Sequence, residues 1–168
     1  MKIRFGECPS RHWDYCIVGS GPAGMTLALE LERLGQRRIL LVESGGGKVS
    51  PDHRALSDLA AGDMPHQFPM AEAVNRCLGG TSTTWSGRCL PFDAIDFEKR
   101  DWVPHSGWPV APEDIGRYYD AAGRYLESGA ARFTRTEAIP QAPAHIVPGF
   151  EPGDVTDEAL ERWSPPMR

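Results

Sequence analysis

The sequence predicts an α/β fold with a parallel sheet and long irregular connections. Two short apolar runs, 15–18 and 39–42, flank a helical pattern that begins at Pro22 and is ended by Gly35. This is the order of a βαβ unit, in which a crossover helix joins two parallel strands. The 15 prolines and 40% apolar content of the 168-residue chain favour long loops over disorder. The length suits a single domain, which we expect over residues 1–168.

The βαβ unit is expected over residues 12–47. Both strand runs are short and apolar, as buried parallel strands are, so Cys16 is expected to fill core space. The helix between them carries an apolar stripe of Met25, Leu27, Ala28, Leu31 and Leu34. Gly35 then stands at the usual C-cap position.

The turn after the first strand contains the pattern G-x-G-x-x-G. Gly19 permits the tight turn, Gly21 lets a pyrophosphate approach the backbone, and Gly24 lets the helix pack closely on the strand. Glu43 ends the second strand, where its carboxylate can accept hydrogen bonds from a ribose and would repel the 2′-phosphate of NADP. A tight turn with purely structural glycines is the alternative, which the surrounding pattern disfavours. The motif alone does not distinguish NAD from FAD as the cofactor.

A second glycine-rich segment, 76–92, reads RCLGGTSTTWSGRCLPF. Gly79 and Gly80 permit close backbone approach, the residues 81–84 supply hydroxyls, and Trp85 supplies a flat wall. This composition suits the polar edge of a flavin ring. A hydroxyl-rich turn with a structural tryptophan explains it equally well.

The remaining segments have weaker patterns. We expect a loop over 45–53, a short helix over 54–63, an irregular segment over 64–70, and loop with short strand over 92–110. Residues 111–129 predict a strong helix, with Pro112 at its first position and tyrosines in an apolar, core-facing stripe. A short helix is expected over 157–163.

Charge and composition exclude several classes of partner. The net charge of −5 disfavours nucleic acid or an anionic membrane, because both require a basic surface. We see no secretory signal and no apolar run long enough to span a membrane, so a cytoplasmic location is expected. Four cysteines without a CxxC pair favour thiols over a disulfide framework, and no metal site is expected.

Three ordered blocks resemble the glucose–methanol–choline (GMC) oxidoreductase family. They are DYCIVGSGPAG…LLVESGG, then CLGGTSTTWSGRCLPFDAIDF, then SGWPV…IGRYYDAA. The likeness is greatest to the branch of pyranose oxidases and sugar dehydrogenases. It implies a Rossmann-like FAD-binding domain, and an oxidoreductase that acts on CH–OH groups of alcohols or sugars by hydride transfer to flavin N5.

The resemblance also implies roles for individual residues. Gly19, Gly21 and Ala23, with Glu43, would hold the ADP half. The second segment would approach the pyrophosphate and the flavin, and Trp85 and Ser86 would lie beside the isoalloxazine. The complete set of cofactor residues is Gly19, Gly21, Pro22, Ala23, Gly24, Glu43, Ser44, Gly79, Gly80, Thr81, Ser82, Thr84, Trp85 and Ser86. Pyranose oxidases carry a flavin-linked histidine where this chain has Thr84, so non-covalent FAD is expected.

Family members are several hundred residues long, and their substrate domain and catalytic histidine lie toward the C-terminus. The chain is therefore expected to be the incomplete, N-terminal FAD-binding portion of such an enzyme. None of His12, His53, His66, His105 and His145 matches the family's catalytic base. The alternatives are a non-catalytic FAD-binding fragment and a NAD-linked dehydrogenase. The substrate, the electron acceptor and the oligomeric state are not readable from the sequence.

Overall fold

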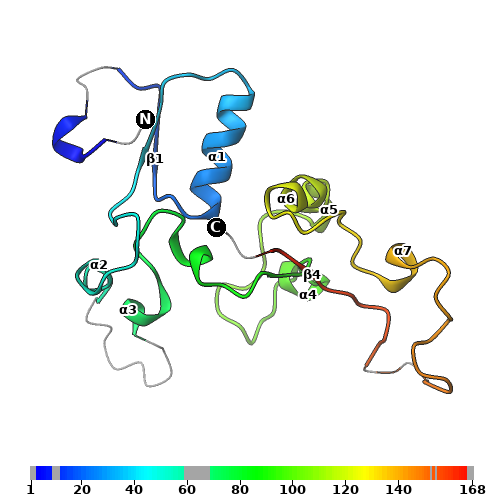
Figure 1. Cartoon of the computed structure of the whole chain (residues 1–168). Coiled ribbons are helices and arrows are strands. Elements are labelled where there is room, and N and C mark those ends of the chain that lie inside the picture. Colours follow the sequence, from blue (N-terminus) through cyan, green and yellow to red (C-terminus); the bar gives the residue numbers. More distant parts are fainter. Residues whose placement is uncertain (1–2, 9–11, 59–68, 152, 154, 166–168) are drawn as a thin grey trace. The chain divides into compact units, whose positions relative to one another are not determined.

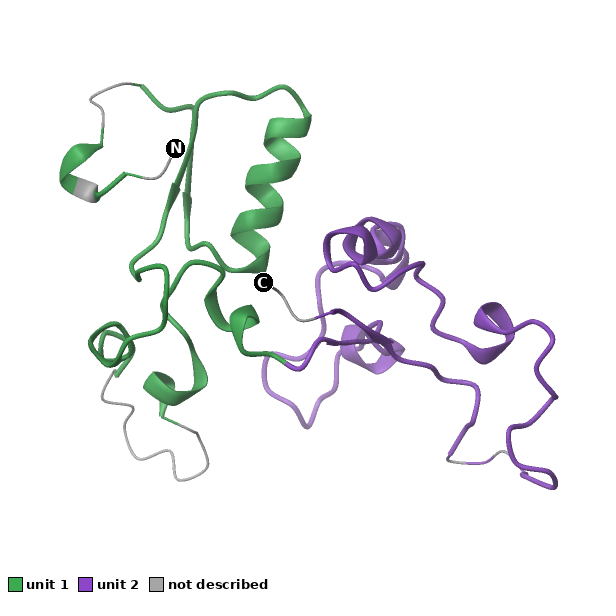
Figure 2. Ribbon diagram, viewed as in Figure 1, with its two compact units in different colours: residues 1–85 green, residues 86–168 purple. Residues whose placement is uncertain are grey.

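The computed structural model describes residues 3–8, 12–58, 69–151, 153 and 155–165. The structure divides into two compact units, Met1–Trp85 and Ser86–Arg168 (Figure 2), and the single FAD-binding domain expected over residues 1–168 stays a prediction. The boundary falls inside the glycine-rich segment 76–92. Each unit is described by itself. No helix within the described ranges is both long and apolar enough to cross a membrane.

The first unit is built around the predicted βαβ arrangement. Strand β1 (Tyr15–Val18) and strand β2 (Ile39–Val42) pair in parallel, in register from Tyr15↔Ile39 to Val18↔Val42. Helix α1 (Pro22–Arg33) joins them and lies alongside the sheet (Figure 1). Pro22 opens the helix, and Gly35, with φ of 86°, ends it. The sequence prediction of these three elements is confirmed.

The expected burial of the two strands is not what the structure has. Ile17 is the buried residue of β1, whereas Cys16 is exposed and Val18 is 83% exposed. The expectation that Cys16 fills core space is therefore wrong. An all-apolar strand suits a sheet covered on both faces, and among the described residues the face that carries Cys16 and Val18 has no such cover.

The connections of the first unit contain short helical turns. They are η1 (Phe5–Glu7), α2 (Pro51–Ala55), α3 (Met70–Ala73) and η2 (Gly80–Thr83). Helix α2 begins inside the expected loop 45–53, because the Ser50 side chain accepts a hydrogen bond from the His53 N–H and caps it. The expected helix 54–63 overlaps only the end of α2, and its residues 59–63 lie outside the described residues. The expected irregular segment 64–70 is described only from residue 69, and α3 begins at Met70.

A parallel contact beyond β2 brings the second glycine-rich segment to the first. Gly46 pairs with Cys77 in a parallel bridge, and the Leu78 N–H donates to the Gly46 carbonyl at 2.9 Å. Gly45 has to be glycine here, because an added Cβ would lie 2.0 Å from the Arg76 carbonyl oxygen. Because of this pairing, residues 77–80 lie beside the carboxyl end of β2.

The second unit has few long elements. Strands β3 (Arg88–Cys89) and β4 (Arg162–Trp163) pair antiparallel, and the helices are α4 (Ala94–Phe97), α5 (Pro112–Gly116), α6 (Tyr119–Tyr125) and α7 (Arg135–Ala138). Residues 162–163 are strand, so the expected helix over 157–163 is wrong. Arg135, only 8% exposed, ties this unit together by donating to the carbonyls of Pro143 and Ala144 and pairing with Glu158.

The strong helix expected over 111–129 is interrupted. Pro112 does open α5, and the Asp114 carboxylate accepts from the Ala111 N–H at 3.0 Å. The helix then ends at Gly116, and α6 begins at Tyr119. Tyr118 between them is 57% exposed, so the tyrosines do not form one buried stripe. Glycine and aromatic residues have weak helix propensity, which makes this the weakest point of the segment.

Candidate functional site

The three glycines of the first motif have distinct surroundings. Gly19 has φ of 96°, and its N–H donates to the Val42 carbonyl at 2.7 Å. A Cβ on Gly24 would lie 2.0 Å from the Gly19 carbonyl oxygen, so α1 packs directly on the turn. A Cβ on Gly21 would meet nothing within 4 Å. Gly24 is therefore required by the fold, whereas Gly21 faces open space at the beginning of α1.

The Glu43 carboxylate receives hydrogen bonds from both sides of the turn. Its Oε2 accepts from the Ser20 N–H at 3.0 Å and the Ser20 Oγ at 2.7 Å. Its Oε1 accepts from the Gly45 N–H at 2.9 Å and from the Ser44 Oγ at 3.4 Å. Partial burial acts to raise the pKa of Glu43, but the bonds from Ser20, Gly45 and Ser44 outweigh it and lower the pKa below the ordinary glutamate value. The hydrogen bonds therefore favour the ionised form of Glu43 and fix the orientation of its carboxylate.

We expect these hydrogen bonds to make the free energy of unfolding depend on pH in the acid range. Because the folded pKa of Glu43 is lowered, its contribution to the free energy of unfolding is complete above about pH 4.3, the usual glutamate value, and is lost as the pH falls through the lower folded pKa. Chemical denaturation of the unchanged chain and of Glu43→Gln at several pH values measures this contribution as the difference in their free energies of unfolding. The difference between the two proteins should shrink toward acid pH, and a difference that stays constant would contradict this assignment.

The hydroxyls of the second glycine-rich segment stabilise their own turn. Ser82 Oγ donates to the Gly79 carbonyl at 2.7 Å, and Thr83 Oγ1 donates to the Gly80 carbonyl at 2.8 Å. Thr84 Oγ1 lies 3.2 Å from the Thr81 carbonyl that it donates to. These contacts run three residues back along η2, as serine and threonine hydroxyls do when they bond to nearby carbonyls. The hydroxyls therefore have partners within the chain.

Asn75 holds both ends of this turn. Its N–H donates to Thr81 Oγ1 at 3.1 Å, and its Nδ2 donates to Thr84 Oγ1 at 2.8 Å. Its Oδ1 accepts from Arg54 at 3.0 Å. Asn75 is itself buried. Sequence reasoning missed this residue, since a single asparagine ahead of the second glycine-rich segment has no periodic signal.

The two glycine segments meet at backbone distance. The Gly79 N–H donates to Ser20 Oγ at 3.2 Å. Gly80 has φ of 63°, and a Cβ on it would lie 3.2 Å from the Gly21 Cα. Gly80 is therefore glycine partly because it packs against the first motif. From the sequence, the two glycine segments were expected to contact separate parts of the cofactor. In the structure they contact each other.

A cavity of about 510 Å³ lies where the segments meet. The predicted cofactor residues that line it are Gly19, Gly21, Pro22, Glu43, Ser44, Gly80 and Thr81. The predicted residues that do not line it are Ala23, Gly24, Gly79, Ser82, Thr84, Trp85 and Ser86. Trp85 is half-buried, and Ser86 is the first residue of the second unit.

Arg76 is a further lining residue of the 510 Å³ cavity that the sequence analysis did not select. Its Nε donates to Ser57 Oγ at 2.6 Å, and its Nη1 donates to Ser44 Oγ at 3.0 Å. Among the described residues that line this cavity, Arg76 is the one cationic side chain. It places a positive charge near the carboxyl end of β2, and its position at the start of the glycine-rich segment 76–92 is the sequence signal that could have revealed it.

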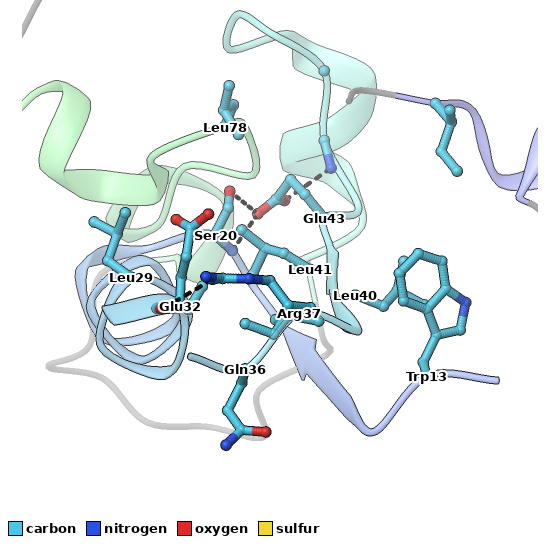
Figure 3. A pocket seen from close by; sticks show the side chains of 15 residues that line it. Trp13, Ser20, Leu29, Glu32, Gln36, Arg37, Leu40, Leu41, Glu43 and Leu78 are labelled. Atoms are coloured by element: carbon cyan, nitrogen blue, oxygen red, sulfur yellow. Dashed lines mark hydrogen bonds between the residues drawn. The ribbon is translucent and has the colours of Figure 1, made fainter. Parts of the chain in front are cut away.

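A larger cavity, of about 700 Å³, lies against β2 and α1 (Figure 3). Its wall includes Leu29, Leu40 and Leu41, and Arg37 donates to the Glu32 carbonyl at 3.3 Å within it. Figure 3 shows Ser20 and Glu43 facing each other at its edge. Ser20 is the residue of the glycine turn that lines it, whereas Gly19, Gly21 and Pro22 at the beginning of α1 do not. Anions bind where a helix begins and backbone N–H groups converge, so the 510 Å³ cavity is the candidate dinucleotide site.

Comparisons with known proteins agree with the class of site. Residues 14–75 match the family model described as FAD binding domain. The chain is 28% identical over 131 residues to paromamine 6′-oxidase of Streptomyces fradiae, and 28% identical over 130 residues to 6‴-hydroxyparomomycin C oxidase of Streptomyces lividus. Each alignment covers 69% of this chain.

A third relative is the oxygen-dependent choline dehydrogenase of Citrobacter koseri, 32% identical over 90 residues, or 54% of this chain. The chain spans 23% of the length of each of the two oxidases and 14% of the choline dehydrogenase. No solved structure matches the chain. The relatives are oxidases and a dehydrogenase, and together with the family match they support FAD as the cofactor of an oxidoreductase-like chain.

Proposed function

We propose that the chain binds FAD without a covalent bond, through an ADP-binding site in the 510 Å³ cavity. The observation that carries the proposal is the open space above Gly21, at the beginning of α1 and opposite Gly80. A Cβ there would occupy the space that a phosphate needs, and an α-helix of 12 residues begins there without a side-chain cap, so the N–H groups that follow Pro22 in its first turn are available to an anion. A cavity of this volume lies within the usual range for bound cofactors, about 300–1,000 Å³.

The chain's own residues have separate roles in this proposal. The turn Gly19–Gly24 and the first N–H groups of α1 hold the pyrophosphate, with Gly80 and Thr81 on its other side. Glu43 accepts from the ribose hydroxyls. Its contact with Ser44 Oγ, at 3.4 Å, is the longest of its four, and a ribose hydroxyl would replace it first. Trp85 and Ser86 remain our proposal for the wall beside the isoalloxazine.

FAD, when bound, supplies the group that accepts a hydride from a substrate. We propose that the chain serves an oxidoreductase of the GMC type that acts on a CH–OH group of an alcohol or sugar. The relatives support this, because paromamine 6′-oxidase and choline dehydrogenase are named for small hydroxyl-bearing compounds. The catalytic base is not assigned to any residue of this chain.

The proposal is tested by titrating the purified chain with FAD, ADP, NAD and NADP and following flavin and tryptophan fluorescence. We expect FAD to bind, ADP to compete with it, and NADP to compete poorly because Glu43 repels a 2′-phosphate. Saturable binding of NAD without binding of FAD would support a NAD-linked dehydrogenase instead. Precipitating the FAD-loaded protein with acid should release all of the flavin into the supernatant, and flavin retained in the pellet would contradict non-covalent binding.

Replacing Arg76 tests the charge of the site. Arg76→Gln removes the positive charge that lines the cavity and should weaken FAD binding about ten-fold, the effect of losing one charge-assisted contact. Arg76→Lys keeps the charge and should weaken binding less. Fluorescence titrations at low and high salt measure both variants. Equal affinities for the two variants would contradict an electrostatic role for Arg76.

A further inference from the structure

Ser20 occupies a variable position of the glycine motif, yet it is one of the most buried side chains among the described residues. It is 0% exposed, although its side chain lies at the edge of the larger cavity in Figure 3. A cofactor in the 510 Å³ cavity therefore does not reach the Ser20 hydroxyl, which is not among the groups lining that cavity. Any effect of the Ser20 side chain on cofactor binding is therefore indirect and acts through the residues that it contacts.

The Ser20 hydroxyl joins two parts of the proposed site. It donates to Glu43 Oε2 at 2.7 Å and accepts from the Gly79 N–H at 3.2 Å. The Cys77 carbonyl, at 3.5 Å, is a longer alternative acceptor. A serine hydroxyl has one proton to donate and lone pairs to accept with, so it can hold both partners at once.

We propose that Ser20 is a positioning residue that aims the Glu43 carboxylate at the ribose and fixes Gly79 and Gly80 opposite Gly21. This inference rests on the proposed FAD site. Without the hydroxyl, Glu43 loses its shortest hydrogen bond and the Gly79 N–H loses its partner. Each side of the cavity then loses one of the bonds that fix it, and Glu43 becomes easier to protonate because one of the bonds that lowers its pKa is gone.

The test compares FAD titrations of the full chain with those of Ser20→Ala over a range of pH. We expect Ser20→Ala to bind FAD about ten-fold more weakly at neutral pH, the effect of one hydrogen bond to a charged group. We also expect the acid limb of its binding curve to move to higher pH. The titrations are limited to pH values at which circular dichroism shows both proteins folded, so that a role in folding alone would not move this limb.

Glu43→Gln shows whether the acid limb reports the titration of Glu43, because this variant removes the carboxylate and leaves its neighbours in place. Those neighbours are Glu32 and Arg37 in the larger cavity, Arg76 in the smaller one, and His53, whose Nδ1 accepts from the Gly46 N–H at 3.3 Å. The matched control is Ser106→Ala. The Ser106 hydroxyl also makes one bond as donor and one as acceptor, both with Arg100 at 2.8 Å, in the second unit. We expect Ser106→Ala to bind FAD as the unchanged chain does.

The outcomes separate the two proposals. If the unchanged chain does not bind FAD, the proposed function fails and the role of Ser20 fails with it. If the chain binds FAD and Ser20→Ala has an unchanged affinity or an unchanged acid limb, only the role of Ser20 is overturned. If Ser20→Ala does not fold, Ser20→Cys, which has a similar size and a weaker donor, takes its place with the same expectations. Failure of both variants to fold beside a folded Ser106→Ala would show a structural residue and overturn the proposal.

Discussion

Gly21→Ala should abolish most FAD binding while leaving the fold intact. The backbone of Gly21 has φ of −67° and ψ of 178°, which alanine adopts without strain, and an added Cβ meets no atom of the chain within 4 Å. The methyl group would instead fill the space proposed for the pyrophosphate. Inserting a methyl group into a packed contact costs about 1–3 kcal/mol, which corresponds to about a five- to 150-fold loss of affinity.

Two measurements on Gly21→Ala check this expectation. Chemical denaturation should give a free energy of unfolding within about 1 kcal/mol of the unchanged chain, because alanine restricts the unfolded state but is a poorer N-cap of α1 than Gly21. Fluorescence titration should give the loss of FAD affinity. Unchanged FAD affinity in a folded Gly21→Ala would place the cofactor elsewhere.

Gly24→Ala should have the opposite pattern, with the fold itself strongly destabilised. The added Cβ would lie 2.0 Å from the Gly19 carbonyl oxygen and 3.3 Å from Ile17 Cγ2. The first contact is with backbone, so α1 has to move away from β1. We expect a loss of more than about 3 kcal/mol, the upper end of ordinary overpacking, from a total stability of about 5–15 kcal/mol.

A matched control for Gly24→Ala is Gly116→Ala. Gly116 also lies in a helix, α5, but a Cβ there meets nothing within 4 Å. This change should leave FAD binding alone and raise stability by about 1 kcal/mol, because alanine is the better helix former. Circular dichroism melts of both variants make the comparison. A Gly24→Ala protein as stable as Gly116→Ala would show that α1 does not pack on Gly19 as described.

The βαβ unit was predictable because its signals are local. The apolar runs Tyr15–Val18 and Ile39–Val42, Pro22 at the helix start and Gly35 after its end all mark boundaries within a few residues. The need for glycine at position 24 was predictable for the same reason. The motif sets the distance between the turn and the helix, and the structure has the close contact that the motif implies.

The features that the sequence did not reveal depend on contacts distant in sequence. Residues 162–163 form a strand because they pair with β3, more than seventy residues earlier. Ser20 and Gly79 are 59 residues apart, and no local pattern signals their hydrogen bond. The assignment of the hydroxyls of residues 81–84 to a ligand stays a prediction, and composition could not reveal that each also has a carbonyl or Asn75 as partner.

The central claim is that the two glycine segments form one cofactor site. Amide chemical shifts in a two-dimensional NMR spectrum of the chain, recorded as FAD is added, test it most directly. The account predicts that the amides of Gly19, Gly21 and Gly80 shift together and saturate at the same FAD concentration, with ADP reproducing these shifts. Shifts confined to one segment, or shifts that saturate at different FAD concentrations in the two, would contradict it.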